Sequence, residues 1–403
     1  MAWHLSGVEL APRDPILGLT EQFNEDTNPV KVNLGVGVYG DESGKLPLLQ
    51  CVRAAEAAMV QAPKARGYLP IDGIAAYDRA VQGLVFGTQT DALREGRIAT
   101  VQTLGGTGAL KVGADFLRRL QPASRPPARV FISDPSWENH RALFEGAGFV
   151  VESYAYYDAT RRDLNLPGML AALHAAPEGS IVVLHACCHN PTGCDLDPAQ
   201  WRDVIAALKG RGLLPFLDMA YQGFGDGIAQ DGAVATMFMA AGLEFFVSTS
   251  FSKSFSLYGE RVGALSVVCD SKDAADRVLS QLKRVIRSNY SNPPTHGAQI
   301  VVTVLTTPAL RVQWEGELGA MRQRIREMRK LLRAKLEAKG VAQDVGYITR
   351  QKGMFSYSGL NQAQMQRLRT EFGVYGLDSG RICVAALNHA NLDRVVDAIA
   401  QVL

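Results

Sequence analysis

The chain has 403 residues, of which 47% are apolar and 20% are charged. This is the composition of an ordinary globular protein that is long enough for two domains. The formal net charge of +2 gives no bulk electrostatic reason to bind nucleic acid or an acidic membrane, so we expect neither as a partner. The first residues lack the basic and then apolar pattern of a signal peptide, and no apolar run approaches the roughly 18 residues that span a bilayer. We therefore expect a cytoplasmic protein.

The six cysteines are scattered along the chain and form no CxxC pair. Such a distribution is typical of reduced thiols in a cytoplasmic protein. The cysteines and histidines near residues 185–194 do not have the spacing of a zinc site, so we expect no bound metal.

The predicted elements alternate between strands and helices through the middle of the chain. Residues 1–13 are polar and contain proline, and we expect them to form an arm. Short apolar runs predict strands at residues 130–133, 181–185, 214–217, 245–250 and 263–268. Helical patterns lie between them, at residues 108–120, 137–147, 198–209 and 273–285. This alternation predicts an α/β fold with a mostly parallel sheet that is flanked by helices.

The pattern changes near residue 308. Apolar residues at helical spacing predict one long amphipathic helix over residues 309–339, and Gly340 is a good stop for it. We expect its Arg-rich stretch 321–330 to form a solvated face. Further on, residues 347–357, a helix at 363–371, a strand near 381–384 and a helix at 392–402 predict a smaller α+β unit.

The segment SFSKSFSLYGERVG, residues 250–263, carries the strongest chemical signal. It follows an apolar run, and it can be interpreted as a polar loop with two surface cations. The alternative is a lysine, Lys253, that bonds covalently to the aldehyde of a cofactor and then transfers protons. Arg261 offers a planar fork that suits phosphate, and the hydroxyls of Ser250 and Ser252 add donors.

Two further motifs follow predicted strands. Asp218 begins DMAYQG after the strand at 214–217, at the edge of a parallel sheet where ligands bind. It could cap a turn, but beside a cofactor lysine its carboxylate would keep a pyridine nitrogen protonated. Tyr221 could donate to the ring oxygen. Asn190, in HNPTG, belongs to ordinary turn chemistry, yet it could also reach a bound ring.

Glycines enter a helix in LGGTGAL, residues 104–110. The backbone N–H groups of a helix start can bind phosphate. The same glycines resemble the start of a dinucleotide fingerprint, but Lys111 occupies the place of its third glycine. No acidic residue follows at the required distance in a clear βαβ unit, so a dehydrogenase is a weak alternative.

Two arginines could hold carboxylates. Arg381 begins an apolar strand in the smaller unit, and Arg287 precedes a proline-rich turn. Either one can be structural or solvated. Placed over a site, Arg381 could bind a carboxylate through two parallel hydrogen bonds.

The motifs occur in a specific order: YLPIDG, LGGTGAL, DPSWENH, HNPTG, DMAYQGF, SFSKSFSLYGERVG, IRSNYSNPP and SGRICVA. Together they resemble the class I aminotransferases, in the branch that acts on aspartate and aromatic amino acids. The resemblance spans nearly the whole chain. It implies the fold type I of enzymes dependent on pyridoxal 5'-phosphate (PLP), with an arm at 1–13, a small domain of 14–45 plus 311–403, and a large cofactor-binding domain of 46–310.

The resemblance also implies roles for individual residues around the cofactor. Lys253 would form the Schiff base, Asp218 would face the pyridine nitrogen, and Trp137 would stack on the ring. Tyr221 and Asn190 would hydrogen-bond the ring oxygen. The phosphate would be held by Gly106, Thr107, Ser250, Ser252 and Arg261, with Tyr68 reaching it from the neighbouring subunit. His140 and His185 would lie behind Asp218, although a buried histidine pair can also be purely structural.

The substrate roles follow in the same way. Arg381 would hold the α-carboxylate, and Arg287 would cross the interface of a homodimer to hold a distal carboxylate. Trp137 and Asn190 would also contact the substrate. Gly37 would belong to a mobile segment that closes over it.

The identity of the amino donor rests on a few positions. Arg287 favours dicarboxylates, but Gly40, Leu46 and Gly67 stand where strict aspartate enzymes of this family commonly have lysine, threonine and asparagine. These changes remove polar groups and enlarge the cavity, which suits an aromatic ring. Thr107 and Asn292, in contrast, are the residues expected in an aspartate enzyme of this family. We predict broad specificity, with phenylalanine, tyrosine and aspartate as donors and 2-oxoglutarate as acceptor.

Three alternatives remain open. The first is a strict aspartate aminotransferase. The second is another PLP enzyme, such as a β-lyase. The third is a non-catalytic homologue, which we would expect to have lost Lys253, Asp218 or Arg381, and none of these is lost.

Overall fold

The computed structural model describes residues 5–12, 14, 16–121 and 128–403. Its main feature is a seven-stranded sheet with the order β2-β10-β9-β8-β7-β3-β4. The strands are Ile98–Leu104 (β2), Arg129–Asp134 (β3), Val150–Ala155 (β4), Ile181–His185 (β7), Leu214–Met219 (β8), Phe245–Ser250 (β9) and Val262–Val268 (β10). Strand β10 is antiparallel to both of its neighbours, and the other pairs are parallel. The predicted α/β class with a mostly parallel sheet is confirmed.

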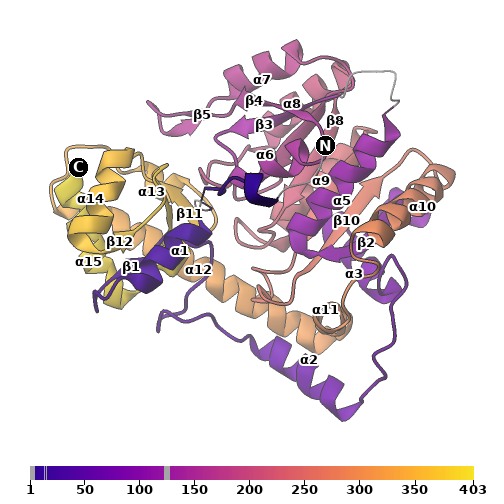
Figure 1. Cartoon of the computed structure of the whole chain (residues 1–403), viewed down its shortest axis with the longest axis horizontal. Helices are drawn as coiled ribbons and strands as arrows, with labels where there is room; N and C mark the ends of the chain where they lie inside the picture. The colour runs from indigo at the N-terminus through magenta and orange to yellow at the C-terminus, as the bar shows by residue number, and fades with distance from the viewer. Residues whose placement is uncertain (1–4, 13, 15, 122–127) are drawn as a thin grey trace.

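Both faces of this sheet are covered by helices (Figure 1). On one face Phe216 of β8 packs into a cluster with α5 (Gly105–Leu120), α6 (Glu138–Glu145) and α10 (Lys272–Asn289). On the other face the next residue, Leu217, packs into a cluster with α3 (Ala75–Phe86), α7 (Leu166–Ala175), α8 (Pro198–Gly210) and α9 (Ile228–Ala240). Because successive strand residues point to opposite faces, burial of both faces requires continuous apolar runs, which is how these strands read in the sequence.

A second group of elements lies beside this sheet, and the N-terminal part of the chain joins it. In Figure 1 the indigo helix α1 (Leu17–Glu25) and strand β1 (Val32–Asn33) lie among the yellow C-terminal elements. Strand β1 pairs in parallel with β12 (Val374–Tyr375), far away in the sequence. The long helix α12 (Pro308–Ala338) runs from this group toward α11 (His296–Thr306) and α2 (Gln50–Gln61).

The remaining elements are short or belong to the C-terminal group. They are the 3-10 helices Leu5–Gly7 and Val384–Ala386, helices Asp91–Arg94 (α4), Tyr347–Arg350 (α13), Gln362–Phe372 (α14) and His389–Val402 (α15), and strands Tyr157–Asp158 (β5), Asp163–Leu164 (β6), Phe355–Tyr357 (β11) and Arg381–Cys383 (β13). Of the predicted arm, residues 5–12 are exposed, and residues 1–4 and 13 lie outside the described residues. Within the described part of the chain, no helix combines the length and the apolarity that a membrane crossing needs.

The predicted elements differ from the structure mainly at their ends. Strands 181–185 and 245–250 are confirmed at both ends, whereas strands β2 and β4 were missed. Helix α5 begins at Gly105 and not at residue 108, because the run of glycines in the sequence resembles a loop. All six cysteines are buried and free.

The prediction of a solvated Arg-rich face on α12 was wrong for Arg329, which is only 2% exposed. Its guanidinium donates to the backbone carbonyls of Ile348 (3.0 Å) and Gly353 (2.9 Å). A buried charge is tolerated where such hydrogen bonds replace water. Arg329 therefore fastens α12 to the segment that precedes β11.

Candidate active site

A cavity of about 720 Å³ opens at the carboxyl ends of the central strands. The register of the sheet places His185 beside Asp218, and Asp218 beside Ser248, at the ends of β7, β8 and β9. In an open parallel sheet, ligands bind at the carboxyl ends of the strands. The cavity is lined by the following predicted site residues: Gly37, Gly106, Thr107, Trp137, His185, Asn190, Asp218, Tyr221, Ser250, Ser252, Lys253, Arg261 and Arg381.

Lys253 stands in the loop after β9, with its side chain inside the cavity. Its ammonium Nζ lies 4.8 Å from the centre of the Tyr221 ring. Burial lowers the pKa of Lys253 to about 8, with the charges of Arg261 and Arg381 acting in the same direction and Asp218 opposing them. The neutral form of this amine is therefore a minority near physiological pH, but it is far more populated than in an ordinary lysine, so the amine can act as a nucleophile or accept a proton.

Asp218 is held by a buried histidine. Burial alone would raise the pKa of Asp218, but the hydrogen bond with His140 and the nearby charge of Lys253 hold it below its usual value. The His140 Nε2 lies 3.0 Å from the Asp218 carboxylate, and the His140 Nδ1 lies 2.9 Å from the Ser136 hydroxyl. Since an ionised carboxylate only accepts, Nε2 carries the proton and Ser136 donates to Nδ1. The site thus contains a buried, oriented anion.

Behind Asp218 three imidazoles lie in a row. His185 is 5.0 Å from His140 and 4.2 Å from His189, measured between ring centres. Burial is the main reason that the pKa values of His185 and His189 fall well below their usual value, so both rings are neutral. His189 was not proposed as a site residue, although it stands beside Asn190 in the HNPTG motif. The His185 and His189 rings therefore add no charge beside the Asp218 carboxylate.

One end of the cavity is built for an anion. Helix α5 begins here at Gly105, whose φ of +69° favours glycine. A Cβ at this position would lie 2.6 Å from Nη2 of Arg261. Arg261 donates to the hydroxyl of Ser252 (3.3 Å) and to the backbone carbonyl of Tyr258 (3.0 Å). Free N–H groups at a helix start, a guanidinium and serine hydroxyls form a cradle for phosphate.

The opposite side of the cavity carries Arg381, which is 1% exposed. It comes from β13 in the C-terminal group and donates to Asn190 Oδ1 (3.1 Å) and to the carbonyl of Gly35 (2.7 Å). Its guanidinium carbon lies 4.3 Å from the centre of the Phe355 ring. The hydrogen bond to Asn190 joins a predicted substrate residue to a predicted cofactor residue.

Comparison with known proteins decides the family. The family model for aminotransferase class I and II matches residues 29–399. The chain is a class I and II aminotransferase. It is 61% identical over 398 residues, 99% of each chain, to an aspartate aminotransferase of Pseudomonas aeruginosa. It is 51% identical over 391 residues, 97% of this chain and 98% of the other, to an aromatic-amino-acid aminotransferase of Escherichia coli.

The solved structures of aminotransferases agree with the fold. An aromatic-amino-acid aminotransferase from Burkholderia pseudomallei, covalently bound to pyridoxal phosphate, superposes with a TM-score of 0.96. It is 63% identical to this aminotransferase, and the match covers 100% of both chains. The resemblance inferred from the motifs is confirmed.

Three predicted site residues do not line the cavity of this aminotransferase chain. His140 lies behind Asp218, as the resemblance implied. Tyr68 is 96% exposed, and Arg287, at the end of α10, donates to Ser291. A single subunit therefore does not bring Tyr68 or Arg287 to its own cavity.

Other residues that line the cavity were missed. Tyr258 belongs to the SFSKSFSLYGERVG segment, so its proximity to Lys253 could have been inferred. Phe355, Ile16 and Leu17 reach the cavity from segments far away in the sequence, and nothing local in the sequence marks them.

Proposed function

We propose that this aminotransferase moves the amino group of phenylalanine, tyrosine or aspartate onto 2-oxoglutarate, with PLP as its cofactor. The convergence of Lys253, Asp218 and Arg381 in one cavity is the observation that carries the proposal. These side chains come from the loop after β9, the end of β8 and strand β13. Each one matches a separate requirement of the reaction.

The cavity fits PLP at both ends of the cofactor. The α5 start with Arg261, Ser250 and Ser252 would hold its phosphate, and Lys253 would hold its aldehyde carbon. The lowered pKa of Asp218 keeps a carboxylate ready for the pyridine nitrogen. When bound, the cofactor supplies a protonated ring that accepts electrons from the substrate.

The side chains of the enzyme would move the protons. Lys253, with its pKa lowered to about 8, would take a proton from the substrate α-carbon and deliver it to the carbon on the cofactor side of the same nitrogen. Burial raises the pKa of Tyr221, so its hydroxyl stays protonated and can donate a hydrogen bond beside Lys253. Arg381 would orient the α-carboxylate through its planar fork.

We propose a homodimer with shared sites, in which Tyr68 and Arg287 serve the cavity of the partner subunit. Their distance from the cavity of their own chain supports this arrangement. We also propose two domains, 46–310 as the large domain and 14–45 plus 311–403 as the small one, with 1–13 as an arm. The pairing of β1 with β12 supports the assignment of residues 14–45 to the small domain.

The lining of the cavity supports aromatic donors. Ile16, Leu17 and Phe355 contribute apolar side chains to it, and such surface favours a phenyl or phenol ring. The relatives carry both aspartate and aromatic names, which agrees with broad specificity. A strict aspartate aminotransferase is the alternative.

Steady-state kinetics distinguish an enzyme of broad specificity from a strict aspartate aminotransferase. With 2-oxoglutarate as acceptor, we expect kcat/KM for phenylalanine and tyrosine to lie within about 200-fold of that for aspartate, because one apolar contact changes specificity by roughly 10- to 200-fold. Ready turnover of aspartate with negligible turnover of phenylalanine would establish the alternative.

The role of Arg287 can be tested by Arg287→Met. We expect kcat/KM for aspartate to fall roughly 10- to 100-fold, since a hydrogen bond to a charged group contributes about 1.5–3 kcal/mol. The value for phenylalanine should change by less than about threefold, because its side chain offers no carboxylate. Arg284→Met, one turn earlier on α10 and exposed, is the control and should leave both values unchanged. An equal loss for both donors would contradict this role.

A further inference from the structure

The segment of residues 36–42 reaches the cavity at Gly37, where it is closely packed. Gly37 lines the cavity, and a Cβ at this position would lie 2.9 Å from the Phe355 ring. The segment belongs to no helix or strand, since strand β1 ends at Asn33 and helix α2 begins at Gln50. Its position at the cavity must therefore be set by contacts with other parts of the chain.

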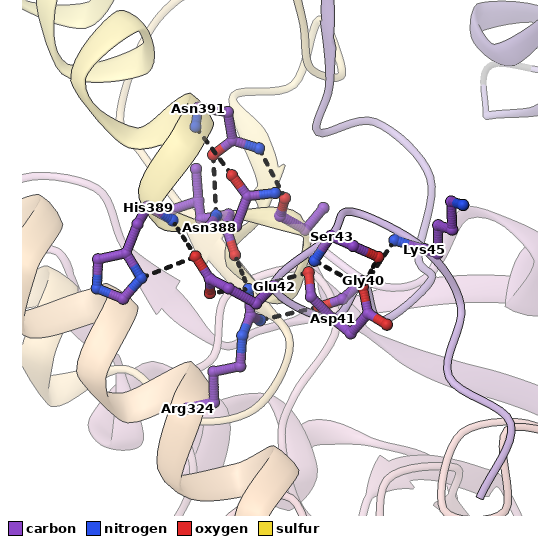
Figure 2. A network of polar contacts seen from close by, with 11 residues as sticks. Gly40, Asp41, Glu42, Ser43, Lys45, Arg324, Asn388, His389 and Asn391 are labelled. Carbon is purple, nitrogen blue, oxygen red and sulfur yellow. Dashed lines mark hydrogen bonds and ion pairs between the residues drawn. The ribbon is translucent and has the colours of Figure 1, made fainter.

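The outer end of the segment is fastened to the C-terminal group. The Gly40 N–H donates to the carbonyl of Ala385 (3.0 Å). Arg324 of α12 donates to the carbonyls of Gly40 (2.8 Å) and Leu387 (2.6 Å). Figure 2 shows the Arg324 guanidinium with Gly40 and Asp41 on one side and Glu42, next to His389 at the start of α15, on the other. Glu42 also accepts from the backbone N–H of His389 (2.9 Å), so this end moves with the C-terminal group.

At Tyr39 the segment is also contacted by a side chain of the loop that follows β9. The Tyr39 N–H donates to the hydroxyl of Tyr258 at 3.0 Å. Tyr258 lines the cavity, five residues after Lys253 in the same loop. Its backbone carbonyl accepts from Arg261 at 3.0 Å. Tyr258 thus supports Arg261 of the phosphate cradle through its main chain and the 36–42 segment through its side chain.

We propose that Tyr258 is a positioning residue for transamination, and that its hydroxyl holds the 36–42 segment against the loop that carries Lys253. The proposal rests on the aminotransferase activity but not on which amino acid is the donor. Burial raises the pKa of Tyr258, so the hydroxyl stays neutral while it accepts the Tyr39 N–H. With this contact in place, Gly37 stays on the wall of the cavity, where it limits the entry of water and aligns the substrate.

The test is Tyr258→Phe in the holoenzyme, which removes the hydroxyl and leaves the ring and the backbone carbonyl. Loss of one neutral hydrogen bond corresponds to a change of roughly 3- to 10-fold. We expect kcat/KM to fall by this factor for the amino donor and for the oxo-acid acceptor alike. We expect the affinity for PLP to stay the same, because Arg261 is held by a backbone carbonyl.

Tyr347→Phe is the matched control. Tyr347 is also buried, and its hydroxyl donates to the carbonyl of Ser358 at 2.6 Å in the C-terminal group, away from the cavity. This variant also loses one neutral hydrogen bond of a buried hydroxyl, which here is the donor and not the acceptor, so it should lose similar stability without the loss in kcat/KM.

Amide hydrogen exchange measured by mass spectrometry gives a direct readout of the contact. A peptide that contains Tyr39 should exchange roughly 3- to 10-fold faster in Tyr258→Phe, and at the unchanged rate in Tyr347→Phe. The proposal is overturned if exchange at Tyr39 is unchanged in Tyr258→Phe. It is also overturned if kcat/KM falls no more than in Tyr347→Phe, or if PLP affinity falls as much as kcat/KM.

Discussion

Lys253→Ala is expected to lower kcat by at least about 10⁴-fold, because in the proposed mechanism Lys253 bonds to the cofactor and moves the proton. The visible absorption of the purified enzyme, which depends on the covalent link, should change as well. Fold stability should not suffer. A lysine whose pKa falls to about 8 in the folded protein is less readily protonated there than in the unfolded chain. Below pH 8 its charge therefore opposes folding, and its removal relieves this cost.

Three measurements check this expectation: single-turnover kinetics, the absorption spectrum and the thermal midpoint of the cofactor-free protein. Lys209→Ala is a suitable control, since Lys209 is an exposed lysine that donates to the carbonyl of Ala241. Near-normal turnover of Lys253→Ala would show that the chemistry does not pass through this amine, and it would refute the mechanism proposed here.

The part of the site that could be predicted from the sequence lies where one segment carries several functional groups. Lys253, Ser252 and Arg261 occupy a single loop, so their proximity follows from the chain itself. Asp218 and His185 end neighbouring parallel strands, and the edge of the sheet brings them together. Short-range spacing and strand register therefore account for the cofactor side of the cavity.

The rest depends on contacts between distant segments. The hydrogen bond from Tyr39 to Tyr258 joins residues 219 positions apart, and that from Arg381 to Asn190 joins residues 191 positions apart. No local pattern encodes such pairs. Arg329 shows the same limit, because a helix pattern marks arginine as a surface residue and cannot reveal the carbonyls that surround it. Strand β4 was missed since the polar residues Glu152 and Ser153 interrupt its apolar run.

Asp218→Asn is expected to lower kcat by roughly 10²- to 10⁴-fold with a smaller effect on KM. The substitution keeps the shape of the side chain but removes the charge that His140 and Lys253 help to stabilise. Removal of one partner of a buried charged pair costs about 3–5 kcal/mol, and this becomes a factor of about 10²–10⁴ in rate if the loss falls on the transition state. In the proposed mechanism Arg381 holds the substrate, so the substitution does not alter substrate binding directly.

Asp231→Asn is the matched control for this prediction. Asp231 is also a buried carboxylate, but it accepts from the backbone N–H groups of Gly223 and Gly225 and does not line the cavity. Its replacement should lower the thermal midpoint and leave kcat within about threefold. If the two variants lost kcat equally, the effect of Asp218 would come from general destabilisation. A selective loss in Asp218→Asn would instead show that the anion at the end of β8 acts on the reacting system, since the two substitutions delete the same charge from equally buried positions.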